Sequence, residues 1–385
     1  MSLVNKEDIR SLFLITLPTI LIMLIIVELV LTWLAPVADP FERYKNPDQT
    51  QSNYIESQFK PNSKFTFEIE QRLPDMDSVV VFTTNNMGFR GDSIIQPKPK
   101  EEYRIFIVGG STTENLLIDD SWGLERKVQE ALQDSLKPKT VKVYNAGKSG
   151  DGSPDHLAML AHRITHLQPD LVVLFPGIND LNRLFGGYDY LHFPISSASE
   201  KTSTLKSLKF FLSNFQLFRR LINVLNQEKP DARTSIFLKT NYTEKVKDVM
   251  ELPLVEELPE ADFGIFRRNI LSFVGILKAQ DTDMLLLTQT HTWGDISDEF
   301  LKSNHWMVGV GNVRYPESKL AMALGQINGI LLGIAEEQNI AVLDLEKEIP
   351  KTSDYFYDDC HFNKGGISKS AELITASIVS NFKTD

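Results

Sequence analysis

The sequence predicts an α/β protein with a three-layer α/β/α architecture, preceded by a helix long enough to cross a membrane. Two observations predict this organisation. Five short apolar runs alternate with segments of helical periodicity between residues 104 and 382, which is typical of parallel strands joined by crossover helices. Closer to the N-terminus, Leu12 to Trp33 form a run of 22 residues that contains a single charged side chain.

The run from Leu12 to Trp33 is expected to be an uncleaved membrane anchor. At about 1.5 Å of rise per residue, a helix of this length can cross a hydrocarbon core of about 30 Å. It is too long for an ordinary signal-peptide core, and Pro36 after Ala35 leaves no A-x-A cleavage pattern. The alternative is a buried core helix, and Glu28 is the residue that favours it.

Charges on either side of this run indicate its orientation. Lys6 and Arg10 precede it, whereas Asp39 and Glu42 are the first charged residues after it. The positive-inside rule then favours a cytoplasmic N-terminus. The chain from Asp39 onward is therefore expected to face the periplasm, the cell surface or a lumen.

Composition excludes several classes of function. A formal net charge of −11 without a strongly basic cluster argues against a nucleic-acid partner. The single cysteine, Cys360, cannot form an internal disulfide. There is no glycine-rich dinucleotide fingerprint and no Walker loop, so no cofactor is expected.

Three regions are expected along the chain: the anchor at 1–35, a small β-rich extension at 36–100, and the main domain at 101–385. In the extension, residues 64–69 alternate in the manner of a half-buried strand, and residues 79–82 form a second candidate strand. The extension ends in NNMGFRGD, residues 85–92, which is interpreted as a glycine-containing turn before the first strand of the main sheet.

The main domain carries the alternating pattern itself. The expected strands are residues 104–108, 141–144, 171–175, 284–288 and 340–344. The expected later helices are residues 265–279, 320–337 and 364–382. Because parallel strands end at one edge of the sheet, residues that follow these strands are expected to share one site.

A helical insertion is expected at about residues 181–262. Apolar side chains recur at helical spacing between residues 205 and 222, with basic residues among them. We expect this helix to pack on the α/β core. Two alternatives remain open: a helix that lies on a membrane, and a cover over the active site.

Ser111 is the candidate nucleophile. It follows the first strand of the main domain in the segment VGGST, and the pair Asp358 and His361 comes 250 residues later in an Asp-x-x-His motif. A serine hydroxyl is a poor nucleophile until an imidazole accepts its proton, and the imidazole needs a carboxylate that fixes its tautomer. An Asp three residues before a His can meet it within one turn.

Two further strand ends offer hydrogen-bond donors for an oxyanion. Gly150 lies in NAGKSGDGS after residues 141–144, where the absence of a Cβ lets a ligand approach its backbone N–H. Asn179 lies in PGIND after residues 171–175. With the N–H of Ser111 itself, these groups can supply three donors to a tetrahedral intermediate.

In these four segments the sequence resembles the SGNH, or GDSL-like, hydrolase family. The segments are VGGSTTEN, NAGKSGDGS, PGIND and DDCHFNKGG, and the resemblance spans roughly residues 101–385. It implies a flavodoxin-like parallel sheet, Ser111 as nucleophile, His361 as base, Asp358 as its orienting acid, and an oxyanion hole at Ser111, Gly150 and Asn179. GGST departs from the commoner GDS form of the first segment but keeps the nucleophile. The stretch 85–92 also resembles membrane-anchored SGNH-like proteins of bacterial envelopes.

Neighbours of the Asp-x-x-His motif receive minor roles. Asp358 is preferred over Asp354 and Asp359 because only Asp358 stands three residues before His361. Asp359 is expected to be solvated, and Cys360 to fill space on the loop.

Two further groups of residues could contribute to a binding site, one for substrate and one for a metal. Gln289, His291 and Trp293 follow the fourth strand of the main domain and could line a substrate site, with plain packing as the alternative. The histidines at 156, 162 and 166 include a pair spaced i, i+4, but no carboxylate or cysteine completes a metal site. We expect these histidines to be solvated or packed, and we expect no metal.

The function expected from these features is a membrane-anchored, extracytoplasmic serine esterase. It would remove acyl groups, with acetyl as the expected group, from envelope or exported glycans through an acyl-Ser111 intermediate. Two alternatives remain: an acyltransferase that passes the acyl group to a sugar hydroxyl, and a catalytically silent glycan-binding or assembly protein of the same fold.

Overall fold

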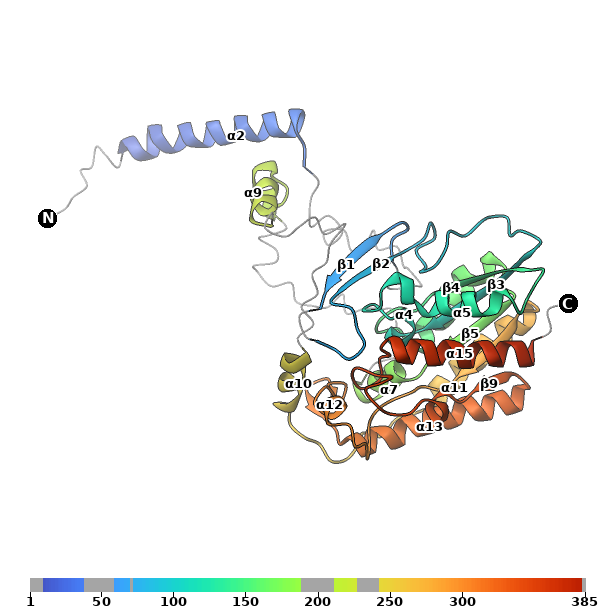
Figure 1. Ribbon diagram of the computed structural model, residues 1–385. Helices are drawn as coiled ribbons and strands as arrows, with labels where there is room; N and C mark the ends of the chain where they lie inside the picture. Colours follow the sequence, from blue (N-terminus) through green and yellow to red (C-terminus); the bar gives the residue numbers. More distant parts are fainter. Residues whose placement is uncertain (1–9, 38–58, 70–71, 188–210, 227–241, 383–385) are drawn as a thin grey trace. The chain divides into compact units, whose positions relative to one another are not determined.

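The computed structural model describes residues 10–37, 59–69, 72–187, 211–226 and 242–382 (Figure 1). The chain divides into two compact units. The smaller unit combines Met1–Asn53 with Pro194–Ala232, and the larger combines Tyr54–Phe193 with Arg233–Asp385. Each unit is described by itself.

The larger unit is built on a parallel sheet of five strands in the order β4-β3-β5-β6-β9. The strands are β3 (Glu102–Gly109), β4 (Thr140–Asn145), β5 (Leu171–Phe175), β6 (Asp283–Leu287) and β9 (Ala341–Leu343). All five coincide with the apolar runs that predicted them. Every residue of β3 and β5 is buried, as expected for strands that are covered on both faces.

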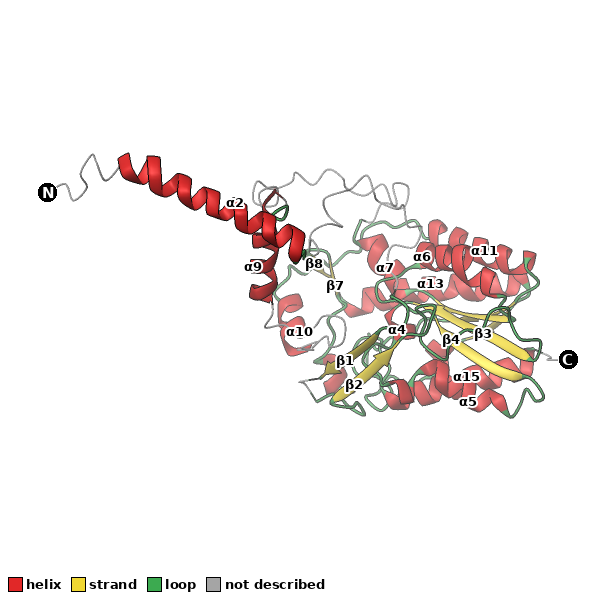
Figure 2. Cartoon of the chain, turned by 90° about the horizontal axis from the view of Figure 1, so that it is seen from above, coloured by secondary structure: helices red, strands yellow, loops and turns green. Residues whose placement is uncertain are grey.

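Helices cover both faces of this sheet, so the predicted three-layer α/β/α class is confirmed (Figure 2). One face carries α5 (Leu124–Gln133) and α15 (Lys364–Asn381), which pack on each other. The other face carries α6 (Ser153–Met159), α11 (Gly264–Ala279) and α13 (Glu317–Gln338).

The short elements lie mainly in the connections between these strands and helices. They are α4 (Ser111–Glu114), η3 (Asp120–Trp122), η4 (Leu160–Ile164), η5 (Thr165–Leu167), α7 (Ile178–Phe185), α10 (Tyr242–Met250), α12 (Glu299–Lys302), β7 (Gly309–Val310), β8 (Val313–Arg314) and α14 (Leu345–Glu348). Helix α13 is long and apolar enough to cross a membrane. It is nevertheless a core helix of this unit, because Leu320, Leu324 and Ile327 are fully buried.

The two strands expected in the extension form an antiparallel hairpin, β1 (Lys64–Glu68) and β2 (Val79–Thr83). Phe67 and Val80 pair across it and are buried in a small cluster that also contains Leu117 and Tyr357. The hairpin is therefore part of the larger unit. Its cluster includes residues close to both Ser111 and Asp358 in the sequence.

The smaller unit consists, in its described part, of two helical segments. A π-helical turn, η1 (Leu12–Thr16), leads into α2 (Leu17–Leu34), none of whose residues is buried. Together they form the helix of 23 residues that is a candidate membrane span, so an apolar N-terminal helix was predicted correctly. Such a helix can serve as an anchor or as a signal sequence.

The second segment of the smaller unit is α9 (Gln216–Asn226), which belongs to the insertion predicted at about residues 181–262. Residues 205–210 of the predicted amphipathic stripe lie outside the described residues. We expected this helix to pack on the α/β core. Within the smaller unit, α9 packs on α2, where Glu28 of α2 accepts the backbone N–H groups of Gln216 and Leu217.

Candidate active site

The structure brings Ser111, His361 and Asp358 into one hydrogen-bonded chain. Nε2 of His361 lies 2.8 Å from Oγ of Ser111, and Nδ1 of His361 lies 2.8 Å from each carboxylate oxygen of Asp358. The backbone N–H of His361 also donates to Asp358, at 2.9 Å. This last bond is the local contact that the i, i+3 spacing makes possible.

Electrostatics in this chain fix the tautomer of the imidazole. Burial alone raises the pKa of Asp358, but the positive charge and hydrogen bonds of His361 outweigh burial and lower it. Burial alone lowers the pKa of His361, but the charge and hydrogen bond of Asp358, together with the charge of Asp359, outweigh burial and leave that pKa raised. An ionised carboxylate only accepts hydrogen bonds, so Nδ1 carries the proton and Nε2 is left to accept the Ser111 hydroxyl.

Ser111 is held at the end of β3. It is the first residue of α4. Gly110 alone separates it from β3 and makes the turn between the strand and the helix. A Cβ on Gly110 would lie 2.4 Å from Nδ2 of Asn179, which is closer than any real contact. Glycine at this position therefore lets the nucleophile turn and the Asn179 amide approach each other.

The three predicted oxyanion donors follow three adjacent strands. Ser111, Gly150 and Asn179 come after β3, β4 and β5, and β3 stands between the other two. Gly150 has a φ of +85° and open space around its Cβ position. Asn179 uses one amide hydrogen on the carbonyl of Asp151 at 2.8 Å, which leaves its second amide hydrogen for a ligand.

The loop that carries Gly150 is fixed by two charged side chains. Glu114, at the end of α4, accepts the backbone N–H of Ser149 at 3.1 Å and pairs with Lys148 at 3.2 Å. Arg183 donates to the carbonyl of Gly150 at 2.7 Å and pairs with Asp155 at 2.6 Å. These bonds hold the loop beside the nucleophile.

Asp151, directly after Gly150, is a buried carboxyl group. Burial and the neighbouring charge of Asp155 raise its pKa to about 8. Its side chain is therefore mostly neutral at pH 7. Sequence reasoning missed this group, because nothing in the local pattern indicates burial of an aspartate in a glycine-rich turn.

Asp359 corrects an expectation from the sequence. It was expected to be solvated, but it is fully buried and accepts three hydrogen bonds. The donors are Nε1 of Trp293 at 2.7 Å and the backbone N–H groups of Trp306 and Met307 at 2.7 and 3.1 Å. Burial and the charge of Asp358 raise its pKa to about 6. Asp359 thus ties the loop at 306–307 to the Asp-x-x-His motif.

Trp306 is a second residue that sequence reasoning missed. Its indole Nε1 donates to Asp358 at 3.1 Å, and its ring is parallel to the His361 ring with centroids 6.5 Å apart. Nζ of Lys245, on α10, lies 4.3 Å from the centroid of the Trp306 ring. A tryptophan in a loop has no motif that could have indicated these contacts.

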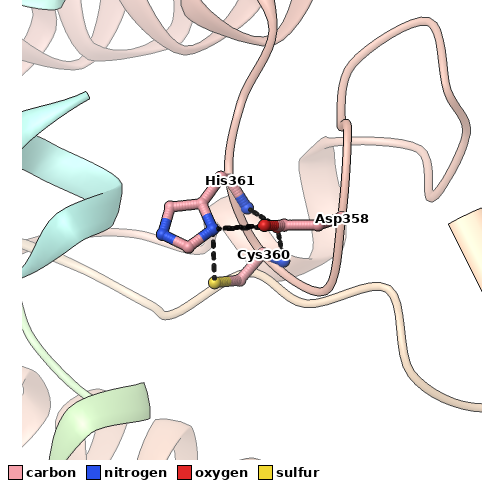
Figure 3. Close-up of side chains that lie close together, drawn as sticks. All are labelled: Asp358, Cys360 and His361. Atoms are coloured by element: carbon pink, nitrogen blue, oxygen red, sulfur yellow. Dashed lines mark hydrogen bonds and ion pairs between the residues drawn. The ribbon is translucent and has the colours of Figure 1, made fainter. Parts of the chain in front are cut away.

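Cys360 lies beside the contact between His361 and Asp358, as Figure 3 shows. It is buried, and its sulfur lies 3.7 Å from Nδ1 of His361 and 3.5 Å from the Met307 sulfur. Burial raises the pKa of the thiol well above its ordinary value, so it remains protonated. Asp358, Cys360 and His361 are also the one cluster among the described residues with metal-ligand spacing. Their contacts with one another and with Ser111 already account for that proximity.

Gln289, His291 and Trp293 do not line an open surface. All three are at least 95% buried. The Trp293 indole is bonded to Asp359, and His291 pairs with Glu346 at 3.1 Å. The structure shows the packing role that was the alternative. We therefore do not propose that these side chains contact a substrate. Trp293 acts instead as a support for Asp359.

The histidines at 156, 162 and 166 were expected to be solvated or packed. His156 is buried, and burial lowers its pKa to about 4. His162 and His166 are exposed. His156 is therefore packed, whereas the other two side chains reach the solvent.

Arg90 shows what the stretch 85–92 does. Its guanidinium is buried and donates to the carbonyls of Asn115 and Ile118, at 3.1 and 2.6 Å, in the chain that follows α4. It also pairs with Asp120 at 3.1 Å and with Glu125 at 3.3 Å. The turn that was predicted here thus carries Arg90, whose positively charged side chain fixes the segment that follows the nucleophile.

The chain is similar to known proteins over most of its length. The model of the GDSL-like lipase/acylhydrolase family matches residues 107–367. Similar solved structures include an acetylxylan esterase from Geobacillus stearothermophilus, at 16% identity over 73% of this chain and 95% of that chain, with a TM-score of 0.39. Another is a GDSL-like lipase from Bacteroides thetaiotaomicron, at 14% identity over 75% and 93%, also with a TM-score of 0.39. A search of curated proteins finds no match.

Proposed function

Because the chain belongs to the GDSL-like lipase/acylhydrolase family and is an ester-bond hydrolase, we propose that it is a membrane-anchored serine esterase with Ser111 as its nucleophile. The observation that carries this proposal is the continuous chain from Asp358 through His361 to Oγ of Ser111, in which both contacts measure 2.8 Å. Such a chain is what nucleophilic catalysis by serine requires.

In the first half-reaction, Oγ of Ser111 attacks the carbonyl carbon of the ester while its proton passes to Nε2 of His361. The negative charge that develops on the carbonyl oxygen is stabilised by the N–H groups of Ser111 and Gly150 and by the amide of Asn179. The intermediate then collapses. Its alcohol leaves with the proton from His361, and the acyl group remains on Ser111.

The second half-reaction repeats these steps with water. His361 takes a proton from the water, whose oxygen attacks the acyl carbon, and the carboxylic acid product leaves as Ser111 recovers its proton. Asp358 stays ionised throughout and stabilises the imidazolium. If a sugar hydroxyl replaced the water, the same groups would perform acyl transfer.

The location proposed for this chemistry is the extracytoplasmic face of a membrane. The exposed helix Leu12–Leu34 is long enough to span the bilayer, and the flanking charges favour a cytoplasmic N-terminus. The larger unit would then meet molecules outside the cytoplasm.

The proposed substrate is a short acyl ester, an acetyl group, on a glycan. Trp306 supports this choice, because its partly exposed indole lies parallel to the ring of the base. An indole offers an apolar face beside polar groups, which suits the alternating C–H and O–H surface of a sugar. The bond cleaved and the acyl-enzyme are the same for any sugar.

The direct test is labelling of the full-length protein in detergent with a fluorophosphonate, followed by peptide mass mapping. We expect one adduct on Ser111, no adduct in Ser111→Ala, and much slower labelling in His361→Ala. Ser368→Ala, which removes an exposed serine on α15, should label normally. A folded protein without an adduct on Ser111 would contradict the proposal and favour the silent binding role.

A second measurement separates hydrolysis from transfer. The protein would be given an acetyl ester in water alone and then with a glycan acceptor, and acetate release would be followed in both. Rapid release in water supports the esterase. Acetate release that stays slow while acetyl appears on the glycan supports the transferase.

A further inference from the structure

We propose that α9 is a second membrane contact: it lies in the membrane interface beside α2, and the groove between the two helices holds acyl chains of the surrounding lipids. This inference rests on the proposed function, because it requires α2 to be a membrane anchor. It adds to that function a second helix, α9, which is fixed to the last turns of the anchor at the membrane surface.

The first observation is the environment of Glu28. A carboxylate within a membrane span is costly unless it has partners. Here it accepts the backbone N–H groups of Gln216 and Leu217, the latter at 3.0 Å. These are the first two residues of α9, whose N–H groups have no partner within the helix and form the positive end of its dipole. The only charged side chain of the span is thus matched by α9.

The second observation is a set of contacts at the end of the anchor. The backbone N–H of Val37 donates to the Gln216 side chain at 2.7 Å, and Arg219 donates to the carbonyl of Val37 at 2.9 Å. Arg220 donates to the carbonyl of Ala35. Glu28 is about 9 Å below the end of α2 at Leu34, from the helical rise. Helix α9 is therefore fixed at the level of the last turns of the anchor, where a span reaches the headgroups.

The third observation is the groove between the two helices. It has a volume of about 900 Å³ and almost purely apolar walls. The walls include Leu24, Ile25 and Leu29 from α2 and Phe215, Phe218 and Leu221 from α9 and the turn before it. Because its α2 wall belongs to the candidate span, the groove is continuous with the region that lipid tails occupy. We therefore assign lipid acyl chains to it, rather than a soluble ligand.

The exposure of apolar side chains on α9 and in the turn before it also supports lipid acyl chains as the occupant of the groove. Phe211 is 60% exposed and Leu221 is 53% exposed, and the Phe211 ring meets the Phe215 ring edge-on with centroids 5.7 Å apart. Contiguous exposed aromatic and aliphatic side chains are unfavourable in water but stable in an acyl-chain environment. Arg219 and Arg220 lie on the same helix, where phosphate headgroups attract cations.

The test uses the full-length chain in liposomes that contain lipids with a nitroxide on the acyl chain. Cys360 is buried beside the triad, so Cys360→Ser provides a background for single labels, and the readout is optical rather than catalytic. An environment-sensitive fluorophore is attached to Leu221→Cys on α9. Ile20→Cys on α2 reports on the anchor, and Met322→Cys, 69% exposed on α13, is the control in the larger unit.

We expect the nitroxide to reduce emission about twofold at positions 20 and 221, and to leave position 322 nearly unchanged. Quenching at 20 without quenching at 221 would overturn this inference and leave the anchor intact. If neither position is quenched, α2 does not lie in the membrane, and both the proposed anchor and this inference are wrong. The two failures are therefore distinguishable.

A pair of variants tests the contact that docks α9. Glu28→Leu keeps the span apolar but removes the acceptor, so quenching at 221 should fall while quenching at 20 persists. Thr32→Leu, one turn further along α2, is the matched control because its hydroxyl donates only to the Glu28 carbonyl within the helix. Quenching at 221 that is the same in Glu28→Leu and in the parent would contradict docking through Glu28.

Discussion

The indole N–H of Trp306 donates to Asp358 at 3.1 Å, on the carboxylate that faces Nδ1 of His361 at 2.8 Å. The backbone N–H groups of Cys360 and His361 donate to the other oxygen of this carboxylate. Asp358 therefore sits among four N–H donors in a buried position. Such a shell fixes both the charge of the carboxylate and the plane in which the imidazole lies.

Replacing Trp306 by Phe removes one of these donors and keeps an aromatic ring. We expect kcat for an acetyl ester to fall about tenfold because His361 is held less firmly. We also expect the acid limb of the pH–rate profile to move to higher pH, since a carboxylate with fewer donors attracts the imidazole proton more strongly. Trp122→Phe is the matched control. A Trp306→Phe enzyme with the parent's rate and profile would show that the indole N–H is dispensable.

The pH dependence of activity should follow His361. Its pKa is raised above the ordinary value of 6.5 because the charge and hydrogen bond of Asp358 and the charge of Asp359 together outweigh burial. The base works only when neutral, so kcat/KM should fall as the pH drops through this raised pKa. Lys245 opposes the rise of that pKa. Lys245→Met should therefore move the acid limb to higher pH at low salt, with less effect at about 1 M salt.

Lys247→Met is the control for this shift, because Lys247 lies on the same helix and is also exposed. The measurement is kcat/KM from pH 5 to pH 9 at two salt concentrations. An acid limb that moves equally in both lysine variants would mean that general surface charge, and not Lys245, influences the base.

Asp151 should make stability depend on pH. Its folded-state pKa is about 8 against an ordinary value of 3.8, so the folded chain holds this proton more tightly than the unfolded chain. Its contribution to stability is complete below about pH 4 and is lost as the pH rises to 8. Asp151→Asn resembles the neutral form, so its stability relative to the parent should increase across this range.

Urea denaturation at pH 5, 7 and 9 checks this expectation for Asp151. Asp354→Asn, at an exposed aspartate, serves as the control. A difference in unfolding free energy between Asp151→Asn and the parent that is constant with pH would contradict the raised pKa.

Arg90 should matter for stability and for rate. Arg90→Met leaves the carboxylates of Asp120 and Glu125 without their buried partner, and we expect a loss of about 3–5 kcal/mol. Arg90→Lys keeps the charge but cannot reach the carbonyls after α4 with the same fork. It should therefore lower kcat as well as the urea midpoint. Arg126→Lys, an exposed exchange with one carbonyl contact, should change neither by much.

The strands could be predicted from the sequence because β3 and β5 are buried on both faces and thus appear as continuous apolar runs. The grouping of Ser111, Gly150 and Asn179 was also accessible, since all three follow parallel strands. Asp359 was misjudged because burial of a carboxylate depends on donors from distant loops. Trp293 and Trp306 are 66 and 53 residues away from it, and such contacts leave no periodicity in the sequence.

The position of α9 could not be predicted for a related reason. An amphipathic stripe shows that a helix has a partner, but not which partner. The choice is made by Glu28, which is 188 residues from Gln216. In the sequence, Glu28 only weakened the case for a membrane span. In the structure, the same residue is the acceptor for α9.

The bond between Ser111 and His361 joins positions 250 residues apart. The ribosome therefore makes the nucleophile long before the base, which lies in the loop between α14 and α15. A nascent chain that has already formed β3, β4 and β5 holds Ser111, Gly150 and Asn179 but lacks the His361 imidazole that accepts the serine proton. Hydrolytic competence thus arrives late in biosynthesis, after all five strands of the sheet have been made. Because His361 is made last, a growing polypeptide cannot use the complete triad on an ester before its sheet has been made.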